Sequence, residues 1–170
     1  MYVCPILLEF MKKITLLIFV CFQFLALSAQ VKAPKWMDKA RKAVVKITTF
    51  DQSDKPLKTG IGFFIDENGM AVSDYTLFKN AARATVTTFD GQELPVERIY
   101  GANELYDVIR FKVTPPKKIQ VLPFPSEPIG TGASAYLLPY SPDKAVKFSV
   151  GPVLEVSKVQ GTYNYYKIQM

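Results

Sequence analysis

Residues 60–78 read Gly-Ile-Gly-Phe-Phe-Ile-Asp-Glu-Asn-Gly-Met-Ala-Val-Ser-Asp-Tyr-Thr-Leu-Phe. Two apolar runs, residues 62–65 and 70–73, flank the polar turn Asp-Glu-Asn-Gly at residues 66–69. An Asn-Gly pair between two such runs favours a β-hairpin. We therefore expect two paired strands here, in a chain that contains no histidine.

The sequence predicts further short strands on both sides of this hairpin. Further runs that alternate apolar and polar residues or are rich in β-branched residues are 44–50, 84–89, 94–100 and 108–113. Six short strands with frequent turns and no helix between them are typical of a small antiparallel barrel, which we place at residues 44–113. Before it, Trp36, Met37 and Ala40 have helical spacing, so a short amphipathic helix is predicted within residues 31–43.

A proline-containing segment divides the rest of the chain. Thr-Pro-Pro-Lys-Lys at residues 114–118 cannot continue a central strand, because proline lacks the backbone donor, so residues 114–132 are predicted to be a linker. Strand patterns return at 134–139, 147–159 and 163–169. We expect these to form part of a second barrel over residues 133–170.

The hairpin resembles the one that carries the catalytic histidine in trypsin-like serine proteases of the HtrA/Deg type. That family's hairpin begins Gly-x-Gly-Phe-(apolar)-Ile and ends in a short apolar strand with Thr-Asn-x-His-Val. On this pattern Ser73 matches the threonine, Asp74 matches the asparagine, and Thr76 stands at the histidine position. Residues 90–96, Asp-Gly-Gln-Glu-Leu-Pro-Val, are similar to the family's step into its fifth strand.

The resemblance runs from about residue 44 to the end of the chain and implies the chymotrypsin fold. The expected fold class is therefore all-β, a trypsin-like double β-barrel with the first barrel complete and the second partial. Residues 105–113 resemble the family's aspartate strand, which places Asp107 at the triad aspartate. The family's Gly-x-Ser-Gly-Gly loop is absent, so the domain is expected to be degenerate and incomplete at its C-terminal side. The serines without that glycine-rich context are Ser134, Ser141, Ser149 and Ser157.

The residues at the family's histidine and aspartate positions, Thr76 and Asp107, indicate whether the domain can be an active protease. A serine nucleophile needs an adjacent base, and the threonine hydroxyl at Thr76 has no basic state near neutral pH. We expect a serine protease-like domain that is proteolytically inactive; if a full-length form were active, it would be a serine-type endopeptidase. The structural alternative for Asp107 is a strand-start aspartate that caps backbone amides or binds a nearby hydroxyl such as that of Thr76. The alternative identities are a fragment of a larger peptidase-domain protein and a non-enzymatic binding module of the cell envelope.

Residues 1–30 read as a signal peptide. Met11-Lys12-Lys13 is a basic start, residues 14–27 are almost entirely apolar, and Ala-Leu-Ser-Ala-Gln at 26–30 offers small residues for cleavage. Met11 offers an alternative start for the protein. The predicted location is the bacterial periplasm or the exterior, and an uncleaved leader would be the one expected link to a membrane.

Composition excludes several kinds of site. Both cysteines, Cys4 and Cys21, fall in the leader, so the exported chain would have neither a disulfide nor a thiol nucleophile. Without cysteine or histidine the usual zinc ligands are missing, and we expect no metal and no cofactor. The chain carries a net charge of +6, but its lysines are scattered. Scattered lysines indicate solvated faces rather than a nucleic-acid surface, so the expected partner is a protein or peptide.

Overall fold

The computed structural model describes residues 33–142, 148–159 and 163–170. The chain divides into two compact units, residues 1–33 and 34–170, and the elements described below belong to the second. The predicted signal peptide over residues 1–30, with Met11, Cys4 and Cys21, lies outside the described residues. Within the described part of the chain, no helix is long and apolar enough to cross a membrane.

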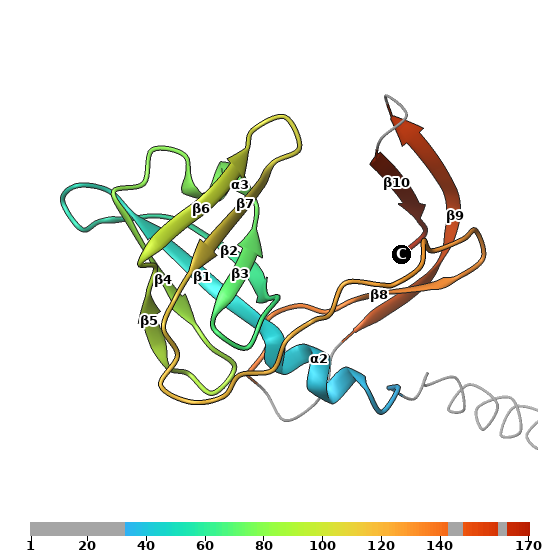
Figure 1. Ribbon diagram of the computed structural model, residues 1–170, viewed down its shortest axis with the longest axis horizontal. Helices are drawn as coiled ribbons and strands as arrows, with labels where there is room; N and C mark the ends of the chain where they lie inside the picture. Colours follow the sequence, from blue (N-terminus) through green and yellow to red (C-terminus); the bar gives the residue numbers. More distant parts are fainter. Residues whose placement is uncertain (1–32, 143–147, 160–162) are drawn as a thin grey trace, which may run out of the picture. The chain divides into compact units, whose positions relative to one another are not determined.

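A short helix, α2, spans Met37–Ala43 and precedes the first strand, in the segment where the sequence predicts one (Figure 1). Asp38 in its first turn pairs with Arg41 at 2.8 Å, three positions later, which suits the spacing of a helix. The opposite face of the helix is apolar and buried, and consists of Met37, Ala40 and Ala43.

Seven antiparallel strands follow and curl into a half-barrel (Figure 1). They are β1 Val44–Phe50, β2 Pro56–Phe64, β3 Met70–Ser73, β4 Arg83–Thr87, β5 Glu93–Pro95, β6 Arg98–Asn103 and β7 Val108–Lys112. Their order in the sheet is β5-β4-β1-β2-β3-β7-β6. The mostly β architecture predicted from the sequence is confirmed at this level.

The core lies inside the curl of this sheet. Val45 and Ile47 are fully buried, whereas Lys46 between them is exposed, as the period of two in a strand requires. Phe64 and Phe111 are the largest fully buried side chains. Burial of each contributes about 1.5–3 kcal/mol. The core therefore draws on β1, β2 and β7.

The predicted hairpin turn is confirmed. Strands β2 and β3 are paired, and a carboxylate oxygen of Asp66 accepts hydrogen bonds from the backbone N–H groups of Asn68 and Met70, both at 2.9 Å. Gly69 has a φ of +92°, and a Cβ there would overlap the carbonyl oxygen of Val113. Only glycine fits this position without strain.

The prediction of one continuous strand over residues 94–100 is wrong. The chain forms β5 and β6 instead, because it changes its pairing partner between them. The backbone N–H of Val96 donates to the carbonyl of Ala84 on β4, whereas that of Glu97 donates to the carbonyl of Lys112 on β7, both at 2.9 Å. This crossing links the two edges of the half-barrel at that end.

The expectation that no helix interrupts these strands is also wrong. Residues Tyr75–Phe78 form a four-residue helix, α3, directly after β3. Tertiary contacts, described with the site below, hold this turn in place. A four-residue turn is too short to show a helical period in the sequence.

Beyond β7, residues 113–133 contain no strand, and a second sheet follows. Its strands are β8 Ser134–Leu137, β9 Ser149–Val159 and β10 Tyr163–Ile168, in the antiparallel order β10-β9-β8. Among the side chains described in this sheet, only Gly151 and Val153 are buried. The segment predicted as part of a second barrel is thus a three-stranded sheet with little core of its own.

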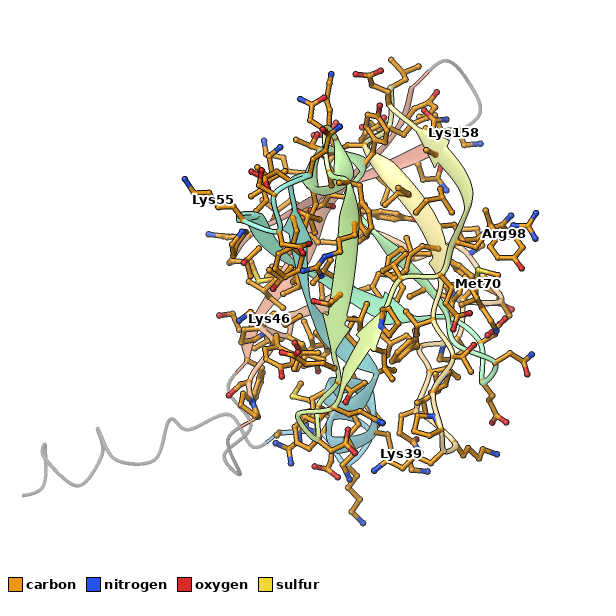
Figure 2. All side chains as sticks on the ribbon, turned by 90° about the vertical axis from the view of Figure 1, so that its left-hand side faces the viewer. Lys39, Lys46, Lys55, Met70, Arg98 and Lys158 are labelled. Carbon is orange, nitrogen blue, oxygen red and sulfur yellow. The ribbon has the colours of Figure 1, made fainter. Side chains whose placement is uncertain are left out.

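Lysine side chains point outward in different directions (Figure 2). Lys39 lies on α2, Lys46 on β1, and Lys55 in the loop before β2, and all three are exposed. These labelled lysines do not gather into one patch.

Candidate functional site

Helix α3 carries Thr76 and lies against β2. Its buried residue Leu77 packs directly over Gly60, where an added Cβ would come within 2.8 Å of a Leu77 methyl group. The first glycine of the Gly-x-Gly pattern therefore lets the helix approach the sheet. The contact between Gly60 and Leu77 thus positions α3, and Thr76 with it, against β2.

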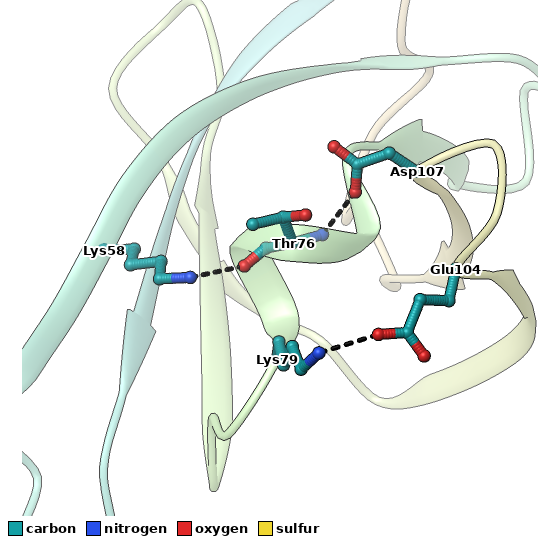
Figure 3. A network of polar contacts seen from close by, with 5 residues as sticks. All are labelled: Lys58, Thr76, Lys79, Glu104 and Asp107. Atoms are coloured by element: carbon teal, nitrogen blue, oxygen red, sulfur yellow. Dashed lines mark hydrogen bonds and ion pairs between the residues drawn. The ribbon is translucent and has the colours of Figure 1, made fainter.

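Asp107 caps the start of α3 from a distant part of the chain. The residue in the N-cap position, Asp74, makes no capping hydrogen bond with its side chain. Instead, the backbone N–H of Thr76 donates to a carboxylate oxygen of Asp107 at 2.6 Å (Figure 3). The N–H of Tyr75 donates to the Asp107 carbonyl at 3.1 Å. The first N–H groups of a helix have no partner inside it, so Asp107 satisfies two of them.

The same contacts favour the ionised form of the Asp107 carboxyl group. The backbone N–H of Thr76 lowers the pKa of this carboxyl, with further contributions from the Thr76 hydroxyl and the positive charge of Lys58; partial burial acts in the opposite direction. Hydrogen bonds to a carboxylate favour its ionised form. A lowered pKa makes Asp107 a weaker base than an ordinary aspartate.

The turn before β7 presents Asp107 in an uncommon backbone conformation. Its φ of 51° lies in the left-handed region, which aspartate tolerates better than most residues. The turn is also stabilised locally, because the side-chain oxygen of Asn103 accepts a hydrogen bond from the N–H of Tyr106 at 3.1 Å. The carboxylate is thus positioned by its own loop as well as by Thr76.

Two lysines complete the network around α3 (Figure 3). The ammonium group of Lys58 on β2 donates to the carbonyl oxygen of Thr76 at 2.6 Å. Lys79, just after α3, pairs with Glu104 at 2.7 Å, and this contact raises the pKa of Lys79. Both ends of α3 are therefore tied to neighbouring segments by charged side chains.

The structure thus brings together the two residues matched to the family's histidine and aspartate, Thr76 and Asp107. Ser73, matched to the family's threonine, is buried and donates its hydroxyl to the carbonyl of Ile61 at 2.7 Å. Asp74, matched to the asparagine, is exposed. Of the serines noted in the sequence, Ser134 lies on β8, Ser149 and Ser157 lie on β9, and Ser141 follows β8.

Sequence reasoning missed Lys58, Lys79 and Glu104. The position of Lys58 could have been predicted. It is separated from Gly60 and Gly62 by steps of two along β2, so its side chain lies on the same face of the sheet as these glycines. No comparable signal existed for the pair of Lys79 and Glu104, which lie 25 positions apart. Their contact depends on how the loop before β7 folds.

A largely apolar pocket of about 530 Å³ lies beside this region. On the half-barrel it is lined by Ile61, Phe63, Val72, Ser73 and Asp74. Leu122, Tyr136 and Leu138 line it from later parts of the chain. The Tyr136 ring meets the Trp36 ring edge-on at 5.1 Å, a favoured aromatic geometry.

In the described part of the chain, no three potential ligands among aspartate, glutamate, cysteine and histidine are grouped to hold a metal ion. Comparison with protein-family models and with curated protein sequences finds no match to this chain.

Proposed function

We propose that this chain is an exported, proteolytically inactive relative of the trypsin-like serine proteases that binds a protein or peptide. The observation that carries the proposal is the bond between the Asp107 carboxylate and the backbone N–H of Thr76. In a working triad that carboxylate orients an imidazole and stabilises its charged form. Here the carboxylate instead accepts a hydrogen bond from the backbone N–H of Thr76, the residue matched to that histidine.

The arrangement of strands supports the family assignment. The hairpin of β2 and β3 leads directly into the turn that bears Thr76, and β7 begins directly after Asp107. The chain between β5 and β6 joins the two edges of the half-barrel through Val96 and Glu97. We take the half-barrel as the first barrel of a chymotrypsin fold and the three-stranded sheet as part of the second.

The chemistry supports the inactive state. Removing the base of a serine protease lowers kcat by about 10⁶-fold. Thr76 cannot replace an imidazole, and Asp107 is a weakened base because its pKa is lowered. The chain contains no histidine that could take over this role.

Apolar surface supports the binding role. The pocket beside Ser73 is lined mainly by aliphatic and aromatic side chains, and Ile61 and Val108 on its border are 45% and 44% exposed. Apolar surface of this kind marks interaction sites in soluble proteins. A protein or peptide chain bound in this pocket would cover these exposed apolar side chains.

A hydrolysis assay tests this proposal. The purified chain is incubated with casein and with a panel of fluorogenic peptides, alongside Asp107→Ala and a buffer blank. We expect no turnover above the blank for either protein. Turnover by the wild type that disappears in Asp107→Ala, while circular dichroism shows the variant folded, would overturn it.

A further inference from the structure

A second pocket, of about 470 Å³, lies against α3. It lies among α3, the start of β4 and strand β6, outside the network of Thr76 and Asp107. Tyr75, Phe78 and Lys79 of the α3 region line it, whereas Thr76 does not. Lys79, which pairs with Glu104, is thus shared with the network around α3, whereas Lys58, Thr76 and Asp107 do not line the pocket.

The lining includes a set of apolar side chains. Ile99 and Ile109 contribute from β6 and β7, Val96 from the connection between β5 and β6, and Phe78 from α3. Phe78 is held by a tilted contact with the buried Phe111, with ring centroids 5.2 Å apart. Pockets of this size with apolar walls and a few polar groups are typical of sites for small ligands.

Positive charge predominates among the lining residues. Of the described residues that line the pocket, Lys79, Arg83 and Arg98 are cationic and Glu97 alone is acidic. Glu97 already accepts a hydrogen bond from the hydroxyl of Thr114 at 3.0 Å. The lining alone carries a formal excess of cations.

These cations can be recruited by a ligand. Arg83 pairs with Asp54, and Lys79 pairs with Glu104, but all four side chains are 46–74% exposed. Exposed ion pairs contribute little to stability, so a ligand carboxylate can compete for them. The guanidinium of Arg98 lies over the Tyr100 ring at 5.3 Å and, among the described residues, has no ion pair with a carboxylate.

We propose that this pocket binds a small carboxylate with an apolar body, such as an aromatic or branched acid or the last residue of a peptide. The apolar body would lie against Phe78 and Ile109, and the carboxylate would meet Arg83 and Arg98. Guanidinium groups bind carboxylates through two parallel hydrogen bonds. This site does not depend on the proposed loss of protease activity.

Calorimetric titration of the full chain with 3-phenylpropanoate tests the proposal. We expect saturable binding, with 3-phenylpropanamide at least about tenfold weaker because it lacks the charge. A tetrapeptide ending in phenylalanine, with a free or an amidated C-terminus, distinguishes the two sources of the carboxylate. Tighter binding of the free-ended peptide than of the small acid would assign the site to peptide ends, and the reverse order to free acids.

Substitutions of residues that line the pocket test whether the acid binds there. Arg83→Gln and Arg98→Gln should each weaken binding of the acid about fivefold or more. Ala102→Phe should block the pocket without changing a charge, because Ala102 lines it on exposed strand β6. Arg110→Gln is the matched control, since Arg110 is exposed on β7 and does not line the pocket.

Circular dichroism of each variant shows whether the fold is retained. Arg83 pairs with Asp54, and its guanidinium also lies over the Phe50 ring at 3.8 Å. If Arg83→Gln unfolds through loss of these contacts, the comparison of Ala102→Phe with Arg110→Gln still decides the question. Absence of saturable binding, equal binding of acid and amide, or unchanged binding in folded Ala102→Phe would each overturn the proposal.

Discussion

The carboxylate of Asp107 lies 2.6 Å from the backbone nitrogen of Thr76, 31 positions earlier in the chain. This one contact joins the loop before β7 to the start of α3. On the resemblance proposed from the sequence, these two residues match the aspartate and the histidine of the trypsin-like proteases. The folded chain therefore brings these two residues into direct contact.

Substitution of Asp107 should distinguish the hydrogen bond from the charge. Asparagine keeps an acceptor oxygen and tolerates the left-handed φ of 51°, whereas alanine leaves the Thr76 N–H without its partner and tolerates that φ less well. We expect Asp107→Ala to lower the free energy of unfolding more than Asp107→Asn. Chemical denaturation of the two variants and the wild type measures this order, and equal stability of all three would contradict the capping role.

Acid should destabilise the folded chain through three carboxyls. The pKa is lowered in Asp38 chiefly by Lys42, in Asp90 chiefly by Lys117, and in Asp107 chiefly by the Thr76 N–H. A folded pKa below the unfolded value of 3.8 stabilises the protein above that value, and this stabilisation is lost as pH falls through the folded pKa.

Denaturant midpoints at about pH 6 and about pH 2 measure this loss. In Asp107→Asn the loss should be smaller than in the wild type, because one of the three groups no longer titrates. A midpoint that is unchanged or rises on acidification of the wild type would show that these contacts do not favour the ionised forms.

Two glycines with positive φ provide a matched pair in the turns. Gly69, at +92°, faces the backbone of Val113, whereas Gly91, at +82°, has open space where a Cβ would lie. Gly91→Ala should cost about 1–2 kcal/mol from backbone strain alone. Gly69→Ala should cost clearly more, because the overlap adds to the strain. Thermal unfolding of both variants gives the comparison, and equal losses would mean that the backbone near Val113 relaxes.

Exposed apolar side chains on the three-stranded sheet should make the chain self-associate or bind a hydrophobic dye. Leu154 and Tyr166 are 45% and 37% exposed on β9 and β10. Leu154→Gln combined with Tyr166→Gln should reduce dye fluorescence and association in analytical ultracentrifugation. Leu105→Gln is the control, because Leu105 is 78% exposed in a turn of the half-barrel. A sharp monomeric species without dye binding in the wild type would contradict the expectation.

Local signals predicted much of the half-barrel. The hairpin of β2 and β3 followed from Asn-Gly between two apolar runs, and β1 followed from its alternating β-branched residues. The split of residues 94–100 could not be predicted, because an apolar pattern records burial but not which strand is the partner. Helix α3 was missed because its capping group, Asp107, is remote in sequence.

The site was predictable only through the resemblance. Matching positions to the protease hairpin and aspartate strand singled out Thr76 and Asp107 as a pair. The contacts of Lys58 and of Lys79 with Glu104 depend on how far long side chains reach across the folded surface. Such contacts leave no periodic trace in the sequence.

The Asp107 carboxylate is held by the backbone of Thr76. Nuclear magnetic resonance can follow this contact through the Asp107 carboxyl carbon and the Thr76 amide proton in an acid titration. We predict that both signals report one transition, with a pKa below the ordinary value of 3.8. A transition at or above that value, with the Thr76 amide unaffected, would contradict the claim.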